Sequence, residues 1–293
     1  MPNFSQKIGA LKGSSTVAIS DRARALQQQG VNVVNLGGGD PDFDTPRHIV
    51  DAGVEAIRGG QTHYVASQGI PAFRKAIAEK LSRENGLSYD PDREIVATAS
   101  GKLALYIALE SLLDPRDEVL YLEPAWVSYR PLIELIGGCP VAVSLSPADN
   151  FAVRSTLLER KITPRTKAIL INSPNNPTGR VLGPEELQVI REVALKHDLW
   201  VVSDEIYEHL VYDGHRHVSI ATLPEMRDRT VVVNGMSKAY AMTGWRIGYL
   251  AAPSVLSEQI LKVQQHVVTC AASFGPLVRS EERRVGKECK SRW

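Results

Sequence analysis

Three segments of the sequence place polar side chains directly after a run of apolar residues. Asn172 begins NSPNNPTG, Asp204 and Tyr207 follow LWVVS, and Ser237 and Lys238 follow TVVVNGM. Apolar runs of this length are typical of buried strands, and open α/β sheets bind ligands at the carboxyl ends of their strands. Together these amide, carboxylate, phenol, hydroxyl and amine groups suit a planar, phosphorylated cofactor that carries a carbonyl group.

The elements that must position these groups follow a repeating pattern. From about residue 95 onward, short runs rich in Val and Ile alternate with longer segments of helical period, which is typical of an α/β fold with a mostly parallel sheet flanked by helices. The clearest helices begin at Gly101 and Pro184, and another is predicted at residues 254–268. The seven predicted strands are residues 95–99, 118–122, 141–145, 167–172, 200–204, 230–234 and 249–252.

The first 44 residues have a different character. We predict a helix at residues 17–29, closed by Gly30, then a short strand at residues 31–36 and the irregular segment GGGDPDFDTP. The glycine run lacks the third glycine of a dinucleotide-binding loop, and Pro41 and Pro46 obstruct the helix that should follow it. We therefore interpret residues 1–44 as an N-terminal arm and part of a small lobe, and residues 45–278 as the large domain.

Composition and charge set bounds on the partners. Lys and Arg total 34 and Asp and Glu total 33, so the net charge of +1 favours neither nucleic acid nor a membrane surface. Cys139, Cys270 and Cys289 have no disulfide or zinc spacing, and no signal peptide or membrane span is visible, so we expect a cytoplasmic protein. The last fifteen residues, RSEERRVGKECKSRW, are charged and aperiodic, so we expect residues 279–293 to be a solvated tail outside the fold.

The segments SPNNPTG, SDEIYEHLVYDG and NGMSKAYAMTGWRIGY resemble those of the class I/II, aspartate aminotransferase-like family. The resemblance extends from about Ser14 to about Pro276. It implies a fold-type I enzyme that uses pyridoxal 5′-phosphate (PLP) and transfers an amino group from an amino acid to a 2-oxo acid by ping-pong chemistry. It also implies a homodimer.

The resemblance assigns the catalytic groups. Lys238 would form the aldimine with the cofactor aldehyde and then move the α-proton of the substrate. Asp204 would keep the pyridine nitrogen protonated, and Tyr207 and Asn176 would hydrogen-bond the phenolic oxygen of the ring. A surface lysine, a helix or turn cap at Asp204 and an Asx-turn at Asn176 are the ordinary structural alternatives.

The cofactor phosphate requires N–H donors and positive charge. Ser100, Gly101 and Lys102 lie between a predicted strand and a predicted helix, where backbone N–H groups and the helix dipole attract an anion. The resemblance adds Ser237 and the guanidinium of Arg246 to this site. For Lys102 it supports mainly the backbone, and we expect a solvated side chain there.

Three further residues are assigned through the resemblance. Trp126, in EPAWVSY, would stack on the ring face, although ordinary core packing is an alternative. Tyr64 would reach the cofactor phosphate of a neighbouring subunit, and Gly39 would lie beside the substrate carboxylate. Gly39, Trp126 and Asn176 would therefore contact substrate.

Other chemistries have weaker support. His209, His215 and His217 follow a strand end in a loop and are expected to be solvated rather than metal ligands. A PLP-dependent lyase on the same fold remains an alternative, as does a non-catalytic PLP-binding module, although no helix-turn-helix segment precedes residue 14. Members of the family continue for roughly another hundred residues into a C-terminal small domain with the arginine that binds the substrate carboxylate. The resemblance ends at about residue 277, so we expect that domain to be absent from this chain.

Overall fold

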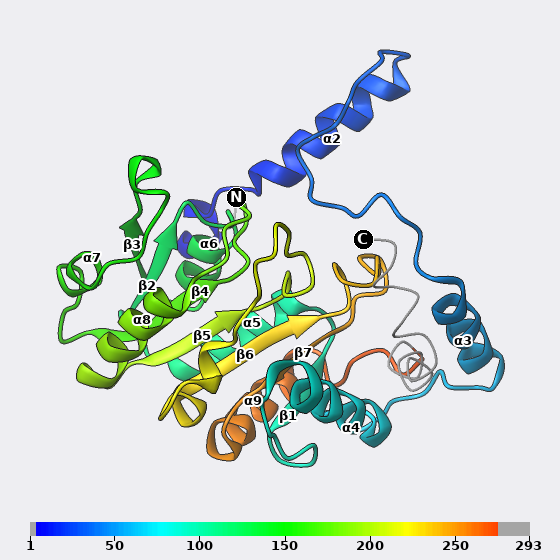
Figure 1. The fold of residues 1–293 in the computed structure, drawn as a ribbon. Helices are drawn as coiled ribbons and strands as arrows, with labels where there is room; N and C mark the ends of the chain where they lie inside the picture. The colour runs from blue at the N-terminus through cyan, green and yellow to red at the C-terminus, as the bar shows by residue number, and fades with distance from the viewer. Residues whose placement is uncertain (1–3, 275–293) are drawn as a thin grey trace.

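The computed structural model describes residues 4–274. Within that range, seven strands form one sheet in the order β1-β7-β6-β5-β4-β2-β3, and β7 is antiparallel to both of its neighbours (Figure 1). The predicted, mostly parallel sheet is therefore confirmed, while the predicted tail at residues 279–293 lies outside the described residues. The strands are β1 (Ile95–Thr98), β2 (Glu118–Glu123), β3 (Cys139–Ser144), β4 (Thr166–Asn172), β5 (Trp200–Asp204), β6 (Thr230–Gly235) and β7 (Gly248–Ala251).

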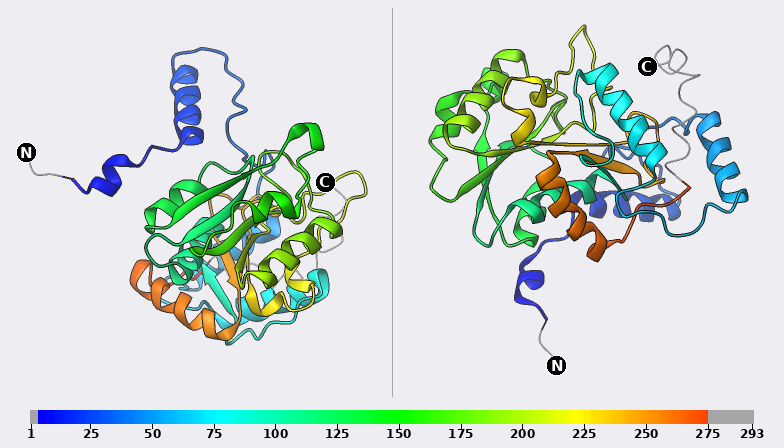
Figure 2. Two further views of the ribbon diagram at one scale, coloured as in Figure 1. Left: turned by 90° about the vertical axis from the view of Figure 1, so that its left-hand side faces the viewer. Right: turned by 90° about the horizontal axis from the view of Figure 1, so that it is seen from below.

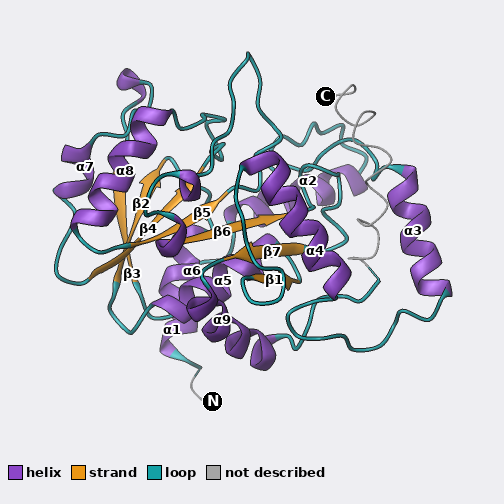
Figure 3. Cartoon of the chain, turned by 60° about the horizontal axis from the view of Figure 1, so that its bottom comes forward, coloured by secondary structure: helices purple, strands orange, loops and turns teal. Residues whose placement is uncertain are grey.

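Helices cover both faces of the sheet (Figure 3). Apolar side chains alternate along β4, so that Ala168 and Leu170 belong to one buried cluster and Ile169 and Ile171 to another. Strands that are buried on both faces read as continuous apolar runs, which is why the sequence revealed them. The first face packs against α5 (Gly101–Leu112), α6 (Tyr129–Leu135) and α9 (Ser254–Val267); the second packs against α4 (Pro71–Lys80), α7 (Ser155–Glu159) and α8 (Pro184–Lys196).

The helices predicted from Gly101 and Pro184 begin at those residues. Ser100 Oγ accepts a hydrogen bond from the Leu103 N–H at 3.1 Å and so caps α5. The remaining helical elements are α3 (Arg47–Arg58), the π-helix η1 (Leu81–Asn85), and the short 3₁₀ segments η2 (Pro147–Asp149), η3 (Ile220–Thr222) and η4 (Arg227–Arg229). Within the described residues, no helix combines the length and apolar character that a membrane span requires.

The N-terminal segment projects from the body of the molecule (Figures 1 and 2). It contains α1 (Gln6–Ala10) and α2 (Ser15–Gln28), so the helix predicted at residues 17–29 is confirmed with slightly different ends. The strand predicted at residues 31–36 is wrong, because that stretch is irregular and its Val34 and Leu36 side chains are 80% and 90% exposed. A run with β propensity forms a strand only where a neighbouring strand satisfies its backbone groups.

Candidate active site

The sheet brings the predicted groups to one edge. Strands β4, β5 and β6 are parallel neighbours, and Asn172 pairs in register with Asp204, which pairs with Val233. Strand β1 is parallel to β6 because both pair with the antiparallel β7, so the N-terminus of α5 lies at the same edge. Because β7 runs the other way, Arg246 enters this edge just before the strand begins.

Asp204 is a buried carboxylate with two hydrogen-bond donors. Its residue is 5% exposed, the Tyr129 hydroxyl donates to Oδ2 at 2.8 Å, and the Ile206 N–H donates to Oδ1 at 3.3 Å. Burial raises the pKa of Asp204 to about 6, against the effect of these two donors and with a contribution from the charge of Glu205. The carboxylate is therefore poised to gain from a cation placed next to it.

Tyr207 and Asn176 meet beside Asp204. The side-chain amide of Asn176 donates to the Tyr207 hydroxyl oxygen at 3.3 Å. Asn172 orients this pair, since its Oδ1 accepts from the Asn176 N–H at 2.8 Å and its Nδ2 donates to the Asp204 carbonyl at 2.9 Å. Burial and the Asp204 charge raise the pKa of Tyr207, while the bond from Asn176 opposes them. The two side chains predicted to share one ligand oxygen are thus in contact.

Lys238 lies in a partly buried position at the end of β6. Its amine donates to the carbonyl of Gly39, so the structure joins two residues that the sequence separates by 199 positions. Burial lowers the pKa of Lys238, and Arg246 lowers it further, while Asp40 raises it. A lowered pKa increases the fraction of neutral amine, which is the nucleophilic form.

The start of α5 has the features of an anion site. Ser100 is 7% exposed and Ser237 is 8% exposed, and the positive end of the helix dipole lies here. Burial lowers the pKa of Lys102, and the charge of Arg246 lowers it further. Arg246, which itself donates to the Thr243 carbonyl at 2.9 Å, thus acts on both Lys102 and Lys238, and the shared field favours a bound anion.

Trp126 lies at the same edge and joins two of the groups described above. Its ring meets the Tyr129 ring edge-on, with centroids 5.4 Å apart and planes at 87°. Lys102 is exposed to solvent as expected, and its Nζ also lies 4.7 Å from the centroid of the indole ring. The Tyr64 side chain is 87% exposed, so almost all of its surface is available to another chain.

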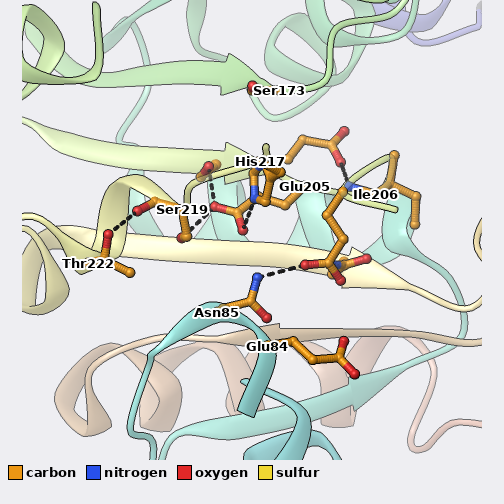
Figure 4. A network of polar contacts seen from close by, with 12 residues as sticks. Glu84, Asn85, Ser173, Glu205, Ile206, His217, Ser219 and Thr222 are labelled. Atoms are coloured by element: carbon orange, nitrogen blue, oxygen red, sulfur yellow. Dashed lines mark hydrogen bonds and ion pairs between the residues drawn. The ribbon is translucent and has the colours of Figure 1, made fainter. Parts of the chain in front are cut away.

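The expectation of solvated histidines is wrong for His217. Its side chain is 6% exposed, and its Nε2 lies 3.0 Å from Oε2 of Glu205. The cause is the buried Glu205 carboxylate, which requires donors and also accepts from Ser203 and Ser219 at 2.8 and 2.7 Å. Figure 4 shows Glu205, His217 and Ser219 grouped in this network. His209 and His215 are exposed as expected, although His209 Nε2 lies 3.5 Å from Glu84 Oε2.

Sequence reasoning missed several residues at this edge. The Tyr129 hydroxyl donates to Asp204, and Asp40 raises the pKa of Lys238. The side chains of Glu205 and Glu208, on either side of the turn that contains Tyr207, are buried. Tyr129 is the first residue of α6 and follows Trp126 by three positions, and this nearness in sequence was the local signal available. The others depend on segments that only the fold brings together.

Comparison with known proteins assigns the family. The model of aminotransferase class I and II matches residues 31–280. This chain belongs to that family. The aspartate aminotransferase of Musicola paradisiaca is 47% identical over 274 residues, which cover 94% of this chain and 68% of the relative. The probable aspartate/prephenate aminotransferase of Thermus aquaticus is 47% identical over 269 residues, which cover 92% of this chain and 69% of the relative.

Solved structures of family members superpose closely on this aminotransferase. The aspartate aminotransferase from Thermus thermophilus with maleate gives a TM-score of 0.94 at 42% identity and covers 99% of this chain and 75% of its own. The aromatic aminotransferase from Pyrococcus horikoshii OT3 gives a TM-score of 0.86 at 42% identity, and the match covers 93% of this chain and 73% of that structure's chain. Fold type I and an amino-group transfer activity follow from these matches, whereas the names of the relatives differ in substrate.

Proposed function

We propose that this aminotransferase binds PLP at the carboxyl ends of β4, β5 and β6 and uses Lys238 as its covalent anchor and base. When bound, PLP supplies an aldehyde that links to amines and a ring that takes up the electrons released at the substrate Cα. The observation that carries the proposal is the convergence of a buried Asp204, the Tyr207–Asn176 pair and the partly buried Lys238 amine.

The chemistry of the donor set fits this cofactor. Asp204 would hold a proton on the ring nitrogen, and the resulting positive charge would compensate the buried carboxylate. The Tyr207 hydroxyl and the Asn176 amide would donate to the phenolic oxygen of the ring, and Trp126 would cover one ring face. Lys238, whose lowered pKa favours its neutral form, would accept the proton from the substrate Cα.

The phosphate would lie at the start of α5. The N–H groups of Gly101 and Lys102 are in the first turn of that helix, where backbone donors lack partners within the helix. The hydroxyls of Ser100 and Ser237 and the guanidinium of Arg246 would complete this site.

The substrates would be an amino acid and a 2-oxo acid, contacted by Gly39, Trp126 and Asn176. Aspartate is the first donor to test, because relatives at 47% identity are named for it. The active assembly would be a homodimer in the cytoplasm, with Tyr64 reaching the phosphate bound by the partner; its 87% exposure supports this role.

The test is reductive trapping. Borohydride treatment of the chain in PLP, followed by peptide mapping, should place the label on Lys238, because that amine alone would be linked to the cofactor. Lys238→Ala should abolish turnover yet still bind PLP non-covalently, since the ring and phosphate contacts do not involve the amine. In the chain extended by the remaining C-terminal part of an aspartate aminotransferase relative, a half-reaction with aspartate should then convert the cofactor to its amine form. Label concentrated on another lysine would disprove the assignment.

A further inference from the structure

A buried carboxylate lies behind the turn that carries Tyr207. Glu208 directly follows that residue, and its side chain is only 6% exposed. Its oxygens accept hydrogen bonds from the Lys80 ammonium, from Asn85 Nδ2 at 2.7 Å and from Asn234 Nδ2 at 2.8 Å. Figure 4 shows Asn85 pointing into this network. We call these four side chains, Glu208, Lys80, Asn85 and Asn234, the Glu208 cluster.

The Glu208 cluster joins segments that are distant in the sequence. Lys80 ends α4 and Asn85 ends η1, while Asn234 lies in β6, four residues before Lys238. Asn234 Oδ1 also accepts from the Gly235 N–H at 2.7 Å, which fixes the strand end. A shift of the carboxylate would therefore displace both the turn that carries the phenol and the strand end that carries the amine.

The carboxylate of Glu208 is ionised at neutral pH. Burial raises the pKa of Glu208, but the Lys80 and His209 charges and the bonds from Lys80 and Asn85 outweigh it and bring the pKa to about 2. Replacing a buried ion pair by apolar side chains of similar volume is often neutral or stabilising, so such a pair is weak evidence for a role in stability. Its more distinctive contribution is a fixed geometry, because both carboxylate oxygens accept directed hydrogen bonds.

The same region also has a group of potential metal ligands. Ligand atoms of Glu205, Glu208 and His217 lie within 4.8 Å of one another. However, the Lys80 ammonium already provides a cation at Glu208, and Glu205 accepts from His217 and from two serine hydroxyls. The carboxylate oxygens of Glu205 and Glu208 are matched by donors of the protein itself, which favours a positioning role.

We propose that Glu208 is a positioning residue whose carboxylate, held by Lys80, Asn85 and Asn234, fixes the Tyr207 hydroxyl relative to the Lys238 amine. This inference rests on the proposed function, because the two groups would act on the same cofactor. The carboxylate itself lies behind the turn and acts through its neighbours.

The experiment compares two ion pairs that differ in location. Lys80→Met/Glu208→Leu removes the cluster charges together, and Glu84, which lies 3.8 Å from Lys80, keeps its ion pair with Arg83 at 2.7 Å. Arg165→Met/Glu118→Leu is the control, since Glu118 is also buried and ion-paired, at 2.6 Å, but lies at the first position of β2, away from the site. Three quantities are measured. The first is the unfolding temperature without PLP, and the second is the PLP concentration for half-maximal trapping on Lys238. The third is the pH midpoint of the absorbance change of the bound PLP before borohydride is added.

The cluster variant should unfold within a few degrees of wild type. It should nevertheless need at least tenfold more PLP for half-maximal trapping on Lys238, and its absorbance midpoint should move by at least half a pH unit, while the control keeps both values. If the cluster variant loses its unfolding transition, Asn85→Ala replaces it in the test. This variant should need at least threefold more PLP than wild type for half-maximal trapping on Lys238. The inference would be overturned if the cluster variant had the same half-maximal PLP concentration and the same pH midpoint as wild type. The same result in Asn85→Ala would overturn it where that variant replaces the cluster variant. Failure of the wild-type chain to label Lys238 selectively would instead overturn the proposed function, and the inference with it.

Discussion

At the scale of single residues, the site is assembled from groups whose charged forms are destabilised by burial. Asp204 has no ion pair among the described residues, and its pKa of about 6 lies above its ordinary value of 3.8. Lys238 is shifted the opposite way, toward the neutral amine. Both shifts arise from burial, and both groups gain when a protonated ring and an aldehyde are bound next to them.

The ionisation of Asp204 leads to a prediction for the chain without PLP. Asp204→Asn should raise the free energy of unfolding at pH 8 by roughly 3 kcal/mol, because the folded state no longer holds a buried charge. The gain should be complete above about pH 6, shrink as the pH falls toward 3.8, and be absent below it, where aspartate is protonated in both states. Urea unfolding at several pH values measures it.

The same substitution should impair chemistry. Asparagine carries no charge to hold the proton on the ring nitrogen. In the chain extended by the C-terminal part of a relative, single-turnover amino transfer should therefore slow by at least about a hundredfold, a magnitude typical of one lost electrostatic contact. A wild-type single-turnover rate together with an unchanged pH dependence of unfolding would reduce Asp204 to a structural cap.

Residue types could be predicted further than residue partners. Lys238, Asp204, Tyr207 and Asn176 stand out because polar groups at the ends of apolar strands have no role in a core. Tyr129, Glu208 and His217 were missed because their partners lie 75, 128 and 12 positions away in the chain. The placement of α6 and α4 against the ends of the strands, and the path of the loop that carries His217, bring these pairs together.

At the scale of elements, the sheet positions the site through the direction of its strands. Parallel β4, β5 and β6 deliver their carboxyl ends together, and antiparallel β7 delivers its beginning. Continuous apolar runs revealed the central strands because those strands are buried on both faces, unlike the edge strand β3. The runs did not reveal the orientation of β7, since a strand reads alike in either direction, and they misassigned residues 31–36, which pair with no strand among the described residues.

The contact between β7 and α5 is tight enough to test. A Cβ at Gly248 would lie 2.3 Å from the backbone nitrogen of Gly101, whereas one at Gly244 would meet nothing within 4 Å. Gly248→Ala should therefore push the first turn of α5 outward, lower stability by about 1–3 kcal/mol, as overpacking typically does, and weaken PLP binding. Gly244→Ala is the control. Equal PLP affinity in the two variants would show that the start of α5 does not bind the cofactor phosphate.

At the scale of the whole molecule, the described chain contains a well-packed sheet and an arm without a core. Helix α2 projects from the body (Figure 2), and Val17 and Ile19 on it are 56% and 54% exposed. A 14-residue helix with so little tertiary packing is marginal in water. Exposed apolar residues on such an arm favour association with another surface, so the arm is a liability when the chain is alone.

The last prediction concerns the activity of the 293-residue chain. Its aligned part spans 68% of the Musicola paradisiaca relative, and the family resemblance implies that the arginine for the substrate carboxylate lies in the remainder. Without a bidentate charge pair the substrate loses orientation over Lys238, which should reduce kcat/KM by roughly a thousandfold or more. We therefore expect weak PLP binding, negligible transamination and concentration-dependent aggregation. The assay compares this chain, the same chain extended by the remaining C-terminal part of that relative, and the intact relative, with aspartate, alanine and aromatic amino acids as donors. The extended chain should recover both PLP binding and turnover, because its sheet and site are already formed; equal turnover with and without the extension would show that residues 4–274 contain the whole active site.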